Sequence, residues 1–267
     1  MGWWGKVLGG TFGFMLGGPL GLLVGAALGH GFDRGVALHE ELPPGAGYDR
    51  REQTQMAFFT ATFSVMGHLS KSDGRVTRDE IALASQIMNQ LGLDPEMRTF
   101  AKRLFSEGKR PDFPLYDVLD QFRRECRGSS HLLRMFIEIQ LHAAYADGRV
   151  HARERDILQA LCQRLRISRA EFEQIETLVR AGIHYRDASA AGAAEKLSLD
   201  EAYAVLNVRR DSSDAELKKA YRRLMSRHHP DKLVAKGLPE EMMKLATEKT
   251  REIKAAYERI KADRGLA

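Results

Sequence analysis

Residues His228, His229 and Asp231 have types and spacing that could do chemistry. Two imidazoles beside a carboxylate could ligate a metal ion, form a catalytic dyad, or present a docking surface. No third metal ligand follows at a useful spacing, and no Ser or Cys nucleophile stands nearby in a recognisable context. Pro230 holds the His229 and Asp231 side chains apart and stiffens the segment, so the pattern favours docking, with His228 as a neighbour without a role of its own.

A basic amphipathic helix must position this segment. Ser213 and Glu216 have the spacing of a capping box, which predicts that the helix begins there. A further helix is expected to begin at Pro239. Two antiparallel helices would then carry a loop with the tripeptide at its exposed tip. The apolar face of the first helix is Leu217, Ala220, Tyr221 and Leu224, and its basic face is Lys218, Lys219, Arg222, Arg223 and Arg227.

This C-terminal segment resembles the J domain of DnaJ-type co-chaperones. The matching stretches are "AYAVLNV", "DAELKKAYRRLMSRHHPDK" and "REIKAAYERI", and His229, Pro230 and Asp231 align with that family's His-Pro-Asp tripeptide. The resemblance implies that the tripeptide and the basic face bind an Hsp70 chaperone, DnaK in bacteria, and stimulate its ATP hydrolysis. The catalytic groups would belong to that partner, so the chain is expected to be no enzyme and to need no cofactor. Nucleic acid is not expected as a partner, because no aromatic stacking residues accompany the cations.

A short acidic motif occurs twice in the middle of the chain. "HLSKSDGRV" and "HAAYADGRV" align at a constant offset, with Asp73 and Asp147 before a glycine and with Glu80 and Glu154 in the next helix. The pattern resembles the TerB-like family, named for tellurite-resistance proteins. The four carboxylates could form a cation site, since hard cations prefer carboxylate oxygens. The preferred interpretation is structural: the aspartates make turns, the glutamates complement helix N-termini, and no metal is bound.

Residues 7–29, "VLGGTFGFMLGGPLGLLVGAALG", carry no charge and have the length of a transmembrane helix. A cleaved signal peptide is the alternative, but it would have a shorter apolar stretch and a more basic start. Glycine recurs at every fourth position, which in a membrane helix forms a groove for close approach of a second helix. The pattern predicts a homodimer that self-associates through Gly9, Gly13, Gly17, Gly21 and Gly25; the alternative is that these small residues only fill the span.

Composition and periodicity indicate an all-α protein, because apolar residues recur at helical spacing and no alternating strand pattern is convincing. The 267 residues include 41 Lys and Arg against 36 Asp and Glu, a balance that fits an acidic partner or a membrane face but is too weak to indicate nucleic acid. Cys126 and Cys162 lie in apolar helical patterns, which predicts buried thiols in a reducing compartment. The expected division is a periplasmic tip at 1–6, a transmembrane helix at 7–29, a linker at 30–53, a TerB-like domain at 54–181, a flexible linker at 182–197 and a J domain at 198–267.

The order of these parts resembles the DjlA-type family of membrane-anchored DnaJ-like co-chaperones of Gram-negative bacteria. That resemblance implies a single-pass protein of the bacterial inner membrane, in contact with membrane lipid through its first helix. Most of the chain would be cytoplasmic, because the Hsp70 partner consumes cytoplasmic ATP. The expected function is to direct Hsp70 to client proteins at the membrane, which the sequence does not name. The alternative is an envelope-stress or cation-binding adaptor that acts mainly through the TerB-like domain.

Overall fold

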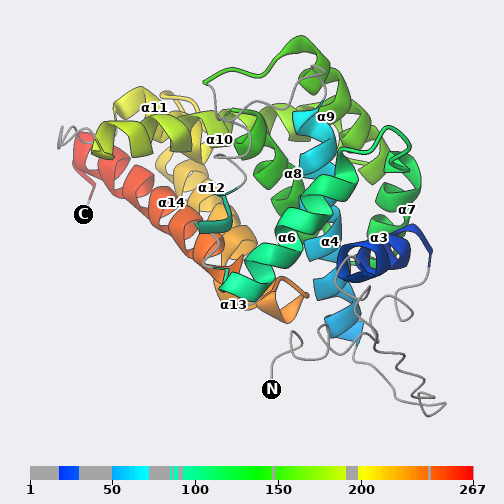
Figure 1. Cartoon of the computed structure of the whole chain (residues 1–267). Coiled ribbons are helices and arrows are strands. Elements are labelled where there is room, and N and C mark those ends of the chain that lie inside the picture. The colour runs from blue at the N-terminus through cyan, green and yellow to red at the C-terminus, as the bar shows by residue number, and fades with distance from the viewer. Residues whose placement is uncertain are drawn as a thin grey trace.

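The computed structural model describes residues 18–29, 50–71, 85, 87–89, 93–145, 148–190, 198–239 and 242–266. Within these ranges the regular structure is helical and no strand occurs, which confirms the all-α expectation (Figure 1). The helices are α3 (Gly18–Gly29), α4 (Arg50–Ser70), α6 (Pro95–Gly108), α7 (Leu115–Glu125), α8 (Ser130–Ala144), α9 (Ala152–Leu165), α10 (Arg169–Ala190), α11 (Leu199–Leu206), α12 (Asp214–His228), α13 (Pro230–Ala235) and α14 (Met243–Asp263).

Helix α4 lies at the centre of the larger core. Its residues 54–67 are all buried, because α6, α7 and α8 pack around it (Figure 1). Phe58, Phe59 and Phe63 are fully buried there. Two buried hydroxyl groups are satisfied within the helix itself: Thr62 Oγ1 donates a hydrogen bond to the Phe58 carbonyl and Ser64 Oγ donates to the Thr60 carbonyl, both at 2.7 Å. After its charged first turn the helix carries no charged side chain from residue 53 to residue 67, and a helix segment of this kind needs such enclosure by its neighbours.

Two glycines allow the close crossing of α4 and α6. A Cβ atom built on Gly67 would lie 2.0 Å from the carbonyl oxygen of Phe105. A Cβ atom on Gly108 would lie 1.7 Å from the carbonyl oxygen of Ser64. Neither oxygen can move without its helix, since both belong to the backbone of a packed element. The missing side chains therefore let the two backbones touch.

A second, smaller core joins α11, α12 and α14 to α10. Leu206 and Leu217 lie in this core, where Leu178 and Ala181 of α10 pack against them and their neighbours. Val179, on the same helix, lies in the larger core. Helix α10 therefore belongs to both cores and connects the C-terminal helices to the central ones.

The segment expected as a flexible linker at 182–197 is helical in its first part. Helix α10 continues to Ala190, and residues 191–197 lie outside the described part of the chain. The composition looks like a tether, but it lacks proline and its alanines favour helix. The C-terminal helices also contact the central ones directly, since Gln55 Nε2 donates a hydrogen bond to the Leu238 carbonyl at 3.4 Å. In this arrangement the C-terminal helices pack against the central ones, and their expected separate movement stays a prediction.

Helix α3 covers the junction of α6 and α7 (Figure 1). The Leu20 backbone N–H donates to Gln121 Oε1 at 2.9 Å, and Arg103 Nη1 donates to the Ala27 carbonyl at 3.0 Å. Helix α3 has 12 residues. Among the helices in the described ranges, none combines the length and the apolar character needed to cross a bilayer.

The two cysteines are buried free thiols, as expected from their sequence positions. Burial raises the pKa of Cys162 to about 12 and raises the pKa of Cys126 as well. Both groups are therefore protonated and unreactive at neutral pH.

Candidate functional site

The His229-Pro230-Asp231 segment lies where α12 ends and α13 begins. His229 joins the two helices with an extended backbone, φ −61° and ψ 122°. Pro230 opens α13 at a position where its missing N–H has no helical partner to lose. Asp231 follows in the first turn, where negative charge is favourable. The expected open loop is therefore wrong in part, because a short helix follows the histidine.

The side chains of His229 and Asp231 both face solvent, with exposed fractions of 46% and 86%. His229 Nδ1 lies 3.9 Å from Asp231 Oδ2. This distance exceeds that of a hydrogen bond, so the two groups do not form a catalytic dyad. Lys232 Nζ donates to Ser226 Oγ at 2.7 Å, which ties the start of α13 back to α12. The arrangement presents two separate polar groups to an external partner on a firmly held backbone.

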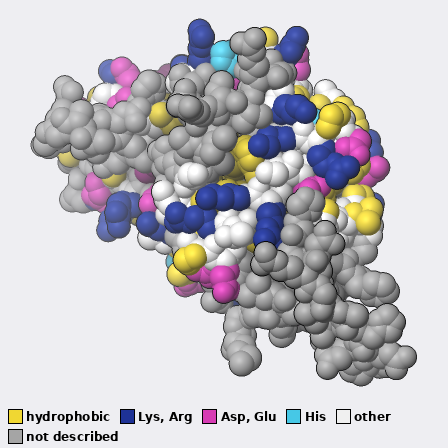
Figure 2. Space-filling model, in the orientation of Figure 1, with side chains coloured by type: hydrophobic (Ala, Val, Ile, Leu, Met, Phe, Trp, Pro, Cys, Tyr) yellow, Lys and Arg dark blue, Asp and Glu magenta, His cyan; other side chains and the backbone are white. Residues whose placement is uncertain are grey.

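The predicted basic face lies along α12, but its members differ in exposure. Lys218, Lys219, Arg222 and Arg223 are exposed, whereas Arg227 is half-buried. None of these side chains forms an ion pair with a carboxylate of the described residues. Elsewhere, on the face seen in Figure 2, Lys and Arg side chains lie at several separate places with Asp and Glu among them. The α12 face thus carries uncompensated positive charge next to His229.

His228 has a partner that the sequence did not indicate. It is 7% exposed, and its Nε2 atom lies 3.7 Å from Glu138 Oε1 of α8. Nearby, Lys249 Nζ donates to Glu252 Oε2 at 3.0 Å and to the Leu178 carbonyl at 3.3 Å. Burial raises the pKa of Glu138 to about 7 and lowers the pKa of His228 to about 3. The expectation that His228 has no role of its own is wrong, because it joins a buried ionisable cluster between the central and C-terminal helices.

Glu138 makes stability depend on pH. Its folded pKa of about 7 lies above the ordinary 4.5, so its stabilising contribution is complete below pH 4.5 and is lost as pH rises through 7. We compare the free energy of unfolding of Glu138→Gln with that of the wild type at about pH 5.5 and at about pH 8. The variant's value minus the wild type's value should be about 2 kcal/mol larger at the higher pH. Urea unfolding of both proteins at the two pH values measures this difference.

His228 contributes with the opposite sign, because its folded pKa of about 3 lies below the ordinary 6.5. Its stabilising contribution is present above pH 6.5 and is lost as pH falls through 3, in the variant and in the wild type alike. Subtracting the wild type's free energy of unfolding from that of the variant therefore leaves the contribution of Glu138. Glu258→Gln, the same change at an exposed position, is the matched control and should show a much smaller change with pH than Glu138→Gln. A constant difference for Glu138→Gln would refute the assignment.

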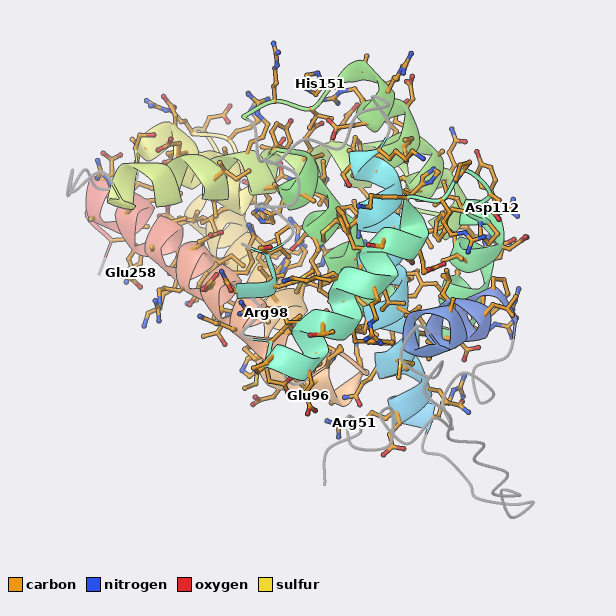
Figure 3. All side chains as sticks on the ribbon, in the orientation of Figure 1. Arg51, Glu96, Arg98, Asp112, His151 and Glu258 are labelled. Carbon is orange, nitrogen blue, oxygen red and sulfur yellow. The ribbon has the colours of Figure 1, made fainter. Side chains whose placement is uncertain are left out.

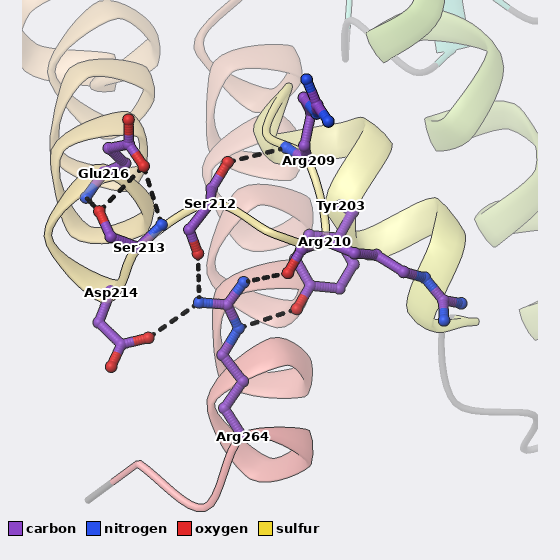
Figure 4. Close-up of polar contacts among 8 residues, drawn as sticks. All are labelled: Tyr203, Arg209, Arg210, Ser212, Ser213, Asp214, Glu216 and Arg264. Carbon is purple, nitrogen blue, oxygen red and sulfur yellow. Dashed lines mark hydrogen bonds and ion pairs between the residues drawn. The ribbon is translucent and has the colours of Figure 1, made fainter.

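Arg264 holds the end of α14 against α11 and the following turn (Figure 4). Its Nε donates to Tyr203 Oη at 2.9 Å, and its Nη2 donates to the Arg210 carbonyl at 2.9 Å. Its Nη1 donates to the Ser212 carbonyl and to Asp214 Oδ1, both at 2.8 Å. One guanidinium thus fixes the start of α12. No sequence signal marked this residue, since its partners lie some fifty positions earlier in the chain.

We expect Arg264→Lys to lower the free energy of unfolding by about 2 kcal/mol, because an ammonium cannot reproduce the planar fork of donors. Urea unfolding monitored by circular dichroism measures the loss. Lys254→Ala, an exposed change on the same helix, should alter stability by less than about 0.5 kcal/mol. Equal stability of Arg264→Lys and the wild type would show that a positive charge is enough to hold the end of α14, without the planar guanidinium.

Of the four carboxylate residues in the acidic repeat, one lies among the residues that the structure describes, namely Glu154. Glu154 accepts a hydrogen bond from the His151 backbone N–H at 2.8 Å, as the third-position member of a capping box that starts α9. Figure 3 shows His151 at the outer edge of the molecule. Glu154 therefore has the structural role that the preferred interpretation gives it, and in the described ranges no three metal-ligating side chains come together. Asp73, Glu80 and Asp147 lie outside the described residues.

The glycines of the predicted self-association face are described in part. Gly21 and Gly25 lie on α3, where Gly21 is buried and Gly25 is exposed with no atom within 4 Å of an added Cβ. Gly9, Gly13 and Gly17 lie outside the described residues.

Three family models match the chain in order. The one described as co-chaperone DjlA transmembrane domain matches residues 1–50, the one described as tellurite resistance protein TerB matches residues 59–177, and the DnaJ domain matches residues 201–264. The described part of the last match contains the tripeptide and the basic face of α12.

Several curated relatives align with the chain from end to end. Proteins named co-chaperone protein DjlA from Photorhabdus laumondii and Coxiella burnetii are each 44% identical to the chain, and one from Salmonella typhimurium is 42% identical. Each alignment covers 100% of both chains. No solved structure matches the chain.

Proposed function

The chain belongs to the DjlA family of co-chaperone proteins, and from this membership we propose that it stimulates ATP hydrolysis by an Hsp70 chaperone, DnaK in bacteria. The ATP and the hydrolytic groups belong to that partner, so this chain acts as a regulator and not as an enzyme. Its membrane attachment directs Hsp70 to client proteins at the inner membrane.

The observation that carries the proposal is the exposure of His229 and Asp231 at the end of an uncompensated basic helix face. Positive charge along α12 steers an acidic surface of the partner toward the tripeptide and accelerates encounter. Asp231 then accepts a charge-assisted hydrogen bond from an arginine of the partner. Pro230 and the short helix α13 hold the backbone in place beforehand, which lowers the entropy lost on docking.

Single-turnover ATP hydrolysis by DnaK, with and without the full chain in neutral detergent, tests this function. We expect faster hydrolysis in the presence of the chain. The concentration needed for half of the effect should rise with salt, because screening weakens attraction between exposed charges. An unchanged hydrolysis rate at low salt and at saturating chain would overturn the proposal.

We also propose that residues 7–29 cross the inner membrane once, contact its lipid, and leave residues 30–267 in the cytoplasm. Insertion into the membrane would take α3 away from α6 and α7, with which it makes hydrogen bonds in the structure. The match of residues 1–50 to the DjlA transmembrane family supports this arrangement.

We propose further that the same helix forms a homodimer through its regularly spaced glycines. A membrane two-hybrid assay should lose its signal in Gly13→Leu, Gly17→Leu and Gly21→Leu, and an undiminished signal in all three would reject the dimer.

A further inference from the structure

The surface between α8, α10 and α12 is hollowed into a small open pocket of about 40 Å3. The C-terminal and central helices both contribute to its walls. The ionisable side chains that line it are His131, Arg134, Glu138, Glu171, Arg223, Arg227 and His228.

The carboxylates in these walls do not compensate all of the arginines. Glu171 accepts hydrogen bonds from the Arg134 guanidinium and from the backbone N–H of Ser168, the latter at 3.0 Å. One acidic group is therefore committed to Arg134 and to the start of α10. Arg223 and Arg227 form no ion pair within the described part of the chain.

Among the arginines that line the pocket, Arg227 is the one whose surroundings most disfavour a positive charge. It is half-buried, and its pKa is lowered by burial and by the nearby charges of Arg134 and Arg223, which outweigh the opposing effect of Glu171. Withdrawing a guanidinium from water beside two others costs free energy unless an anion compensates the charge. The pocket thus has an excess of positive charge with room for a ligand beside it.

Two imidazoles in the same walls have unused hydrogen-bonding atoms. His131 Nδ1 and His228 Nδ1 are both buried, and neither has a hydrogen-bond partner among the described residues. Burial lowers the pKa of both rings, so each is neutral at pH 7 and can donate one N–H. A buried polar atom without a partner is uncommon in a folded protein, so each Nδ1 atom is left to bind water or a ligand that enters between the helices.

We propose that this pocket binds a phosphate-type oxyanion. Such an ion offers several acceptor oxygens and up to two negative charges, which match the paired donors of Arg223 and Arg227 and the N–H groups of the imidazoles. Bound there, it bridges α8 to α12 and strengthens the contact between the central and C-terminal helices. The site uses neither His229 nor Asp231, but it shares Arg223 and Arg227 with the basic face proposed to steer Hsp70. Phosphate binding is measured without Hsp70, so failure of the site and failure of Hsp70 stimulation are distinguishable.

Calorimetric titration of inorganic phosphate into the full chain in neutral detergent, against chloride at equal ionic strength, tests the site. We expect saturable phosphate binding, weakened about tenfold in Arg227→Gln and in Arg223→Gln by the loss of a charge-assisted hydrogen bond. Arg222→Gln is the matched control, since Arg222 is exposed on the same helix and does not line the pocket. Arg223 is also exposed, so its replacement leaves the packing intact if Arg227→Gln unfolds the chain.

The histidine rings provide a second readout. A bound anion favours imidazolium, so phosphate should raise the pKa of His131 in an NMR titration of the wild type and raise it less in Arg223→Gln. No saturable binding, or an equal loss of binding in Arg222→Gln and Arg223→Gln, would overturn the site.

A lipid headgroup could supply the same chemistry. Nanodiscs containing phosphatidylglycerol or phosphatidylcholine separate the two sources. A soluble ligand predicts the same inorganic phosphate affinity in both nanodiscs. A pocket already filled in phosphatidylglycerol, with weakened phosphate binding there only, would overturn the soluble ligand and assign the phosphate to lipid.

Discussion

His229→Gln is expected to weaken stimulation of Hsp70 by about tenfold or more, because it removes a contact group from a desolvated docking surface. The imidazole is about half exposed and makes no hydrogen bond within the described chain, so its loss should not disturb folding. Glutamine keeps polarity and approximate size but cannot place a planar ring with two nitrogens against the partner. Single-turnover hydrolysis over a range of chain concentrations measures both the affinity and the maximal rate.

His151→Gln is the matched control for this prediction, because His151 is also exposed and lies at the far start of α9. It should stimulate Hsp70 as the wild type does. Circular dichroism of both variants checks that their helices are intact. Equal stimulation by His229→Gln and His151→Gln would remove the tripeptide from the mechanism and leave the basic face of α12 as the docking surface.

The second large effect is expected in the central core. Gly108→Ala should lower the free energy of unfolding by about 3 kcal/mol, since overpacking a tight contact forces backbone shifts. The added Cβ would lie 1.7 Å from the Ser64 carbonyl oxygen, and α4 would have to move away from α6. That movement would also loosen the contact of Gly67 with Phe105. Urea unfolding of the full chain measures the change.

Ser106→Ala provides the comparison, because Ser106 is exposed on the same helix. Its free energy of unfolding should stay within about 0.5 kcal/mol of the wild type. If Gly108→Ala is as stable as Ser106→Ala, the two helices can separate at little cost, and the close crossing does not depend on glycine.

Local patterns were sufficient to predict the parts of the candidate docking site. The Ser213–Glu216 capping box is confirmed, with Glu216 N–H donating to Ser213 Oγ at 3.3 Å. The apolar stripe of α12 is also confirmed, since Leu217 and Leu224 are buried. These features depend on residues within one or two helical turns, which is the range over which sequence spacing is informative. The prediction that the last helix begins at Pro239 is wrong by a few residues, because α14 begins at Met243.

By itself, the sequence determined the helical class, the order of the three segments, and the tripeptide at the end of a basic helix, because each depends on local spacing or composition. Only the tertiary structure decided that His228 is buried beside Glu138, that Arg264 clamps the start of α12, and that α10 joins two cores. Those contacts join residues far apart in the chain. Their meeting depends on how whole helices pack, and that depends on the shapes and burial of many side chains together, not on the spacing of any few.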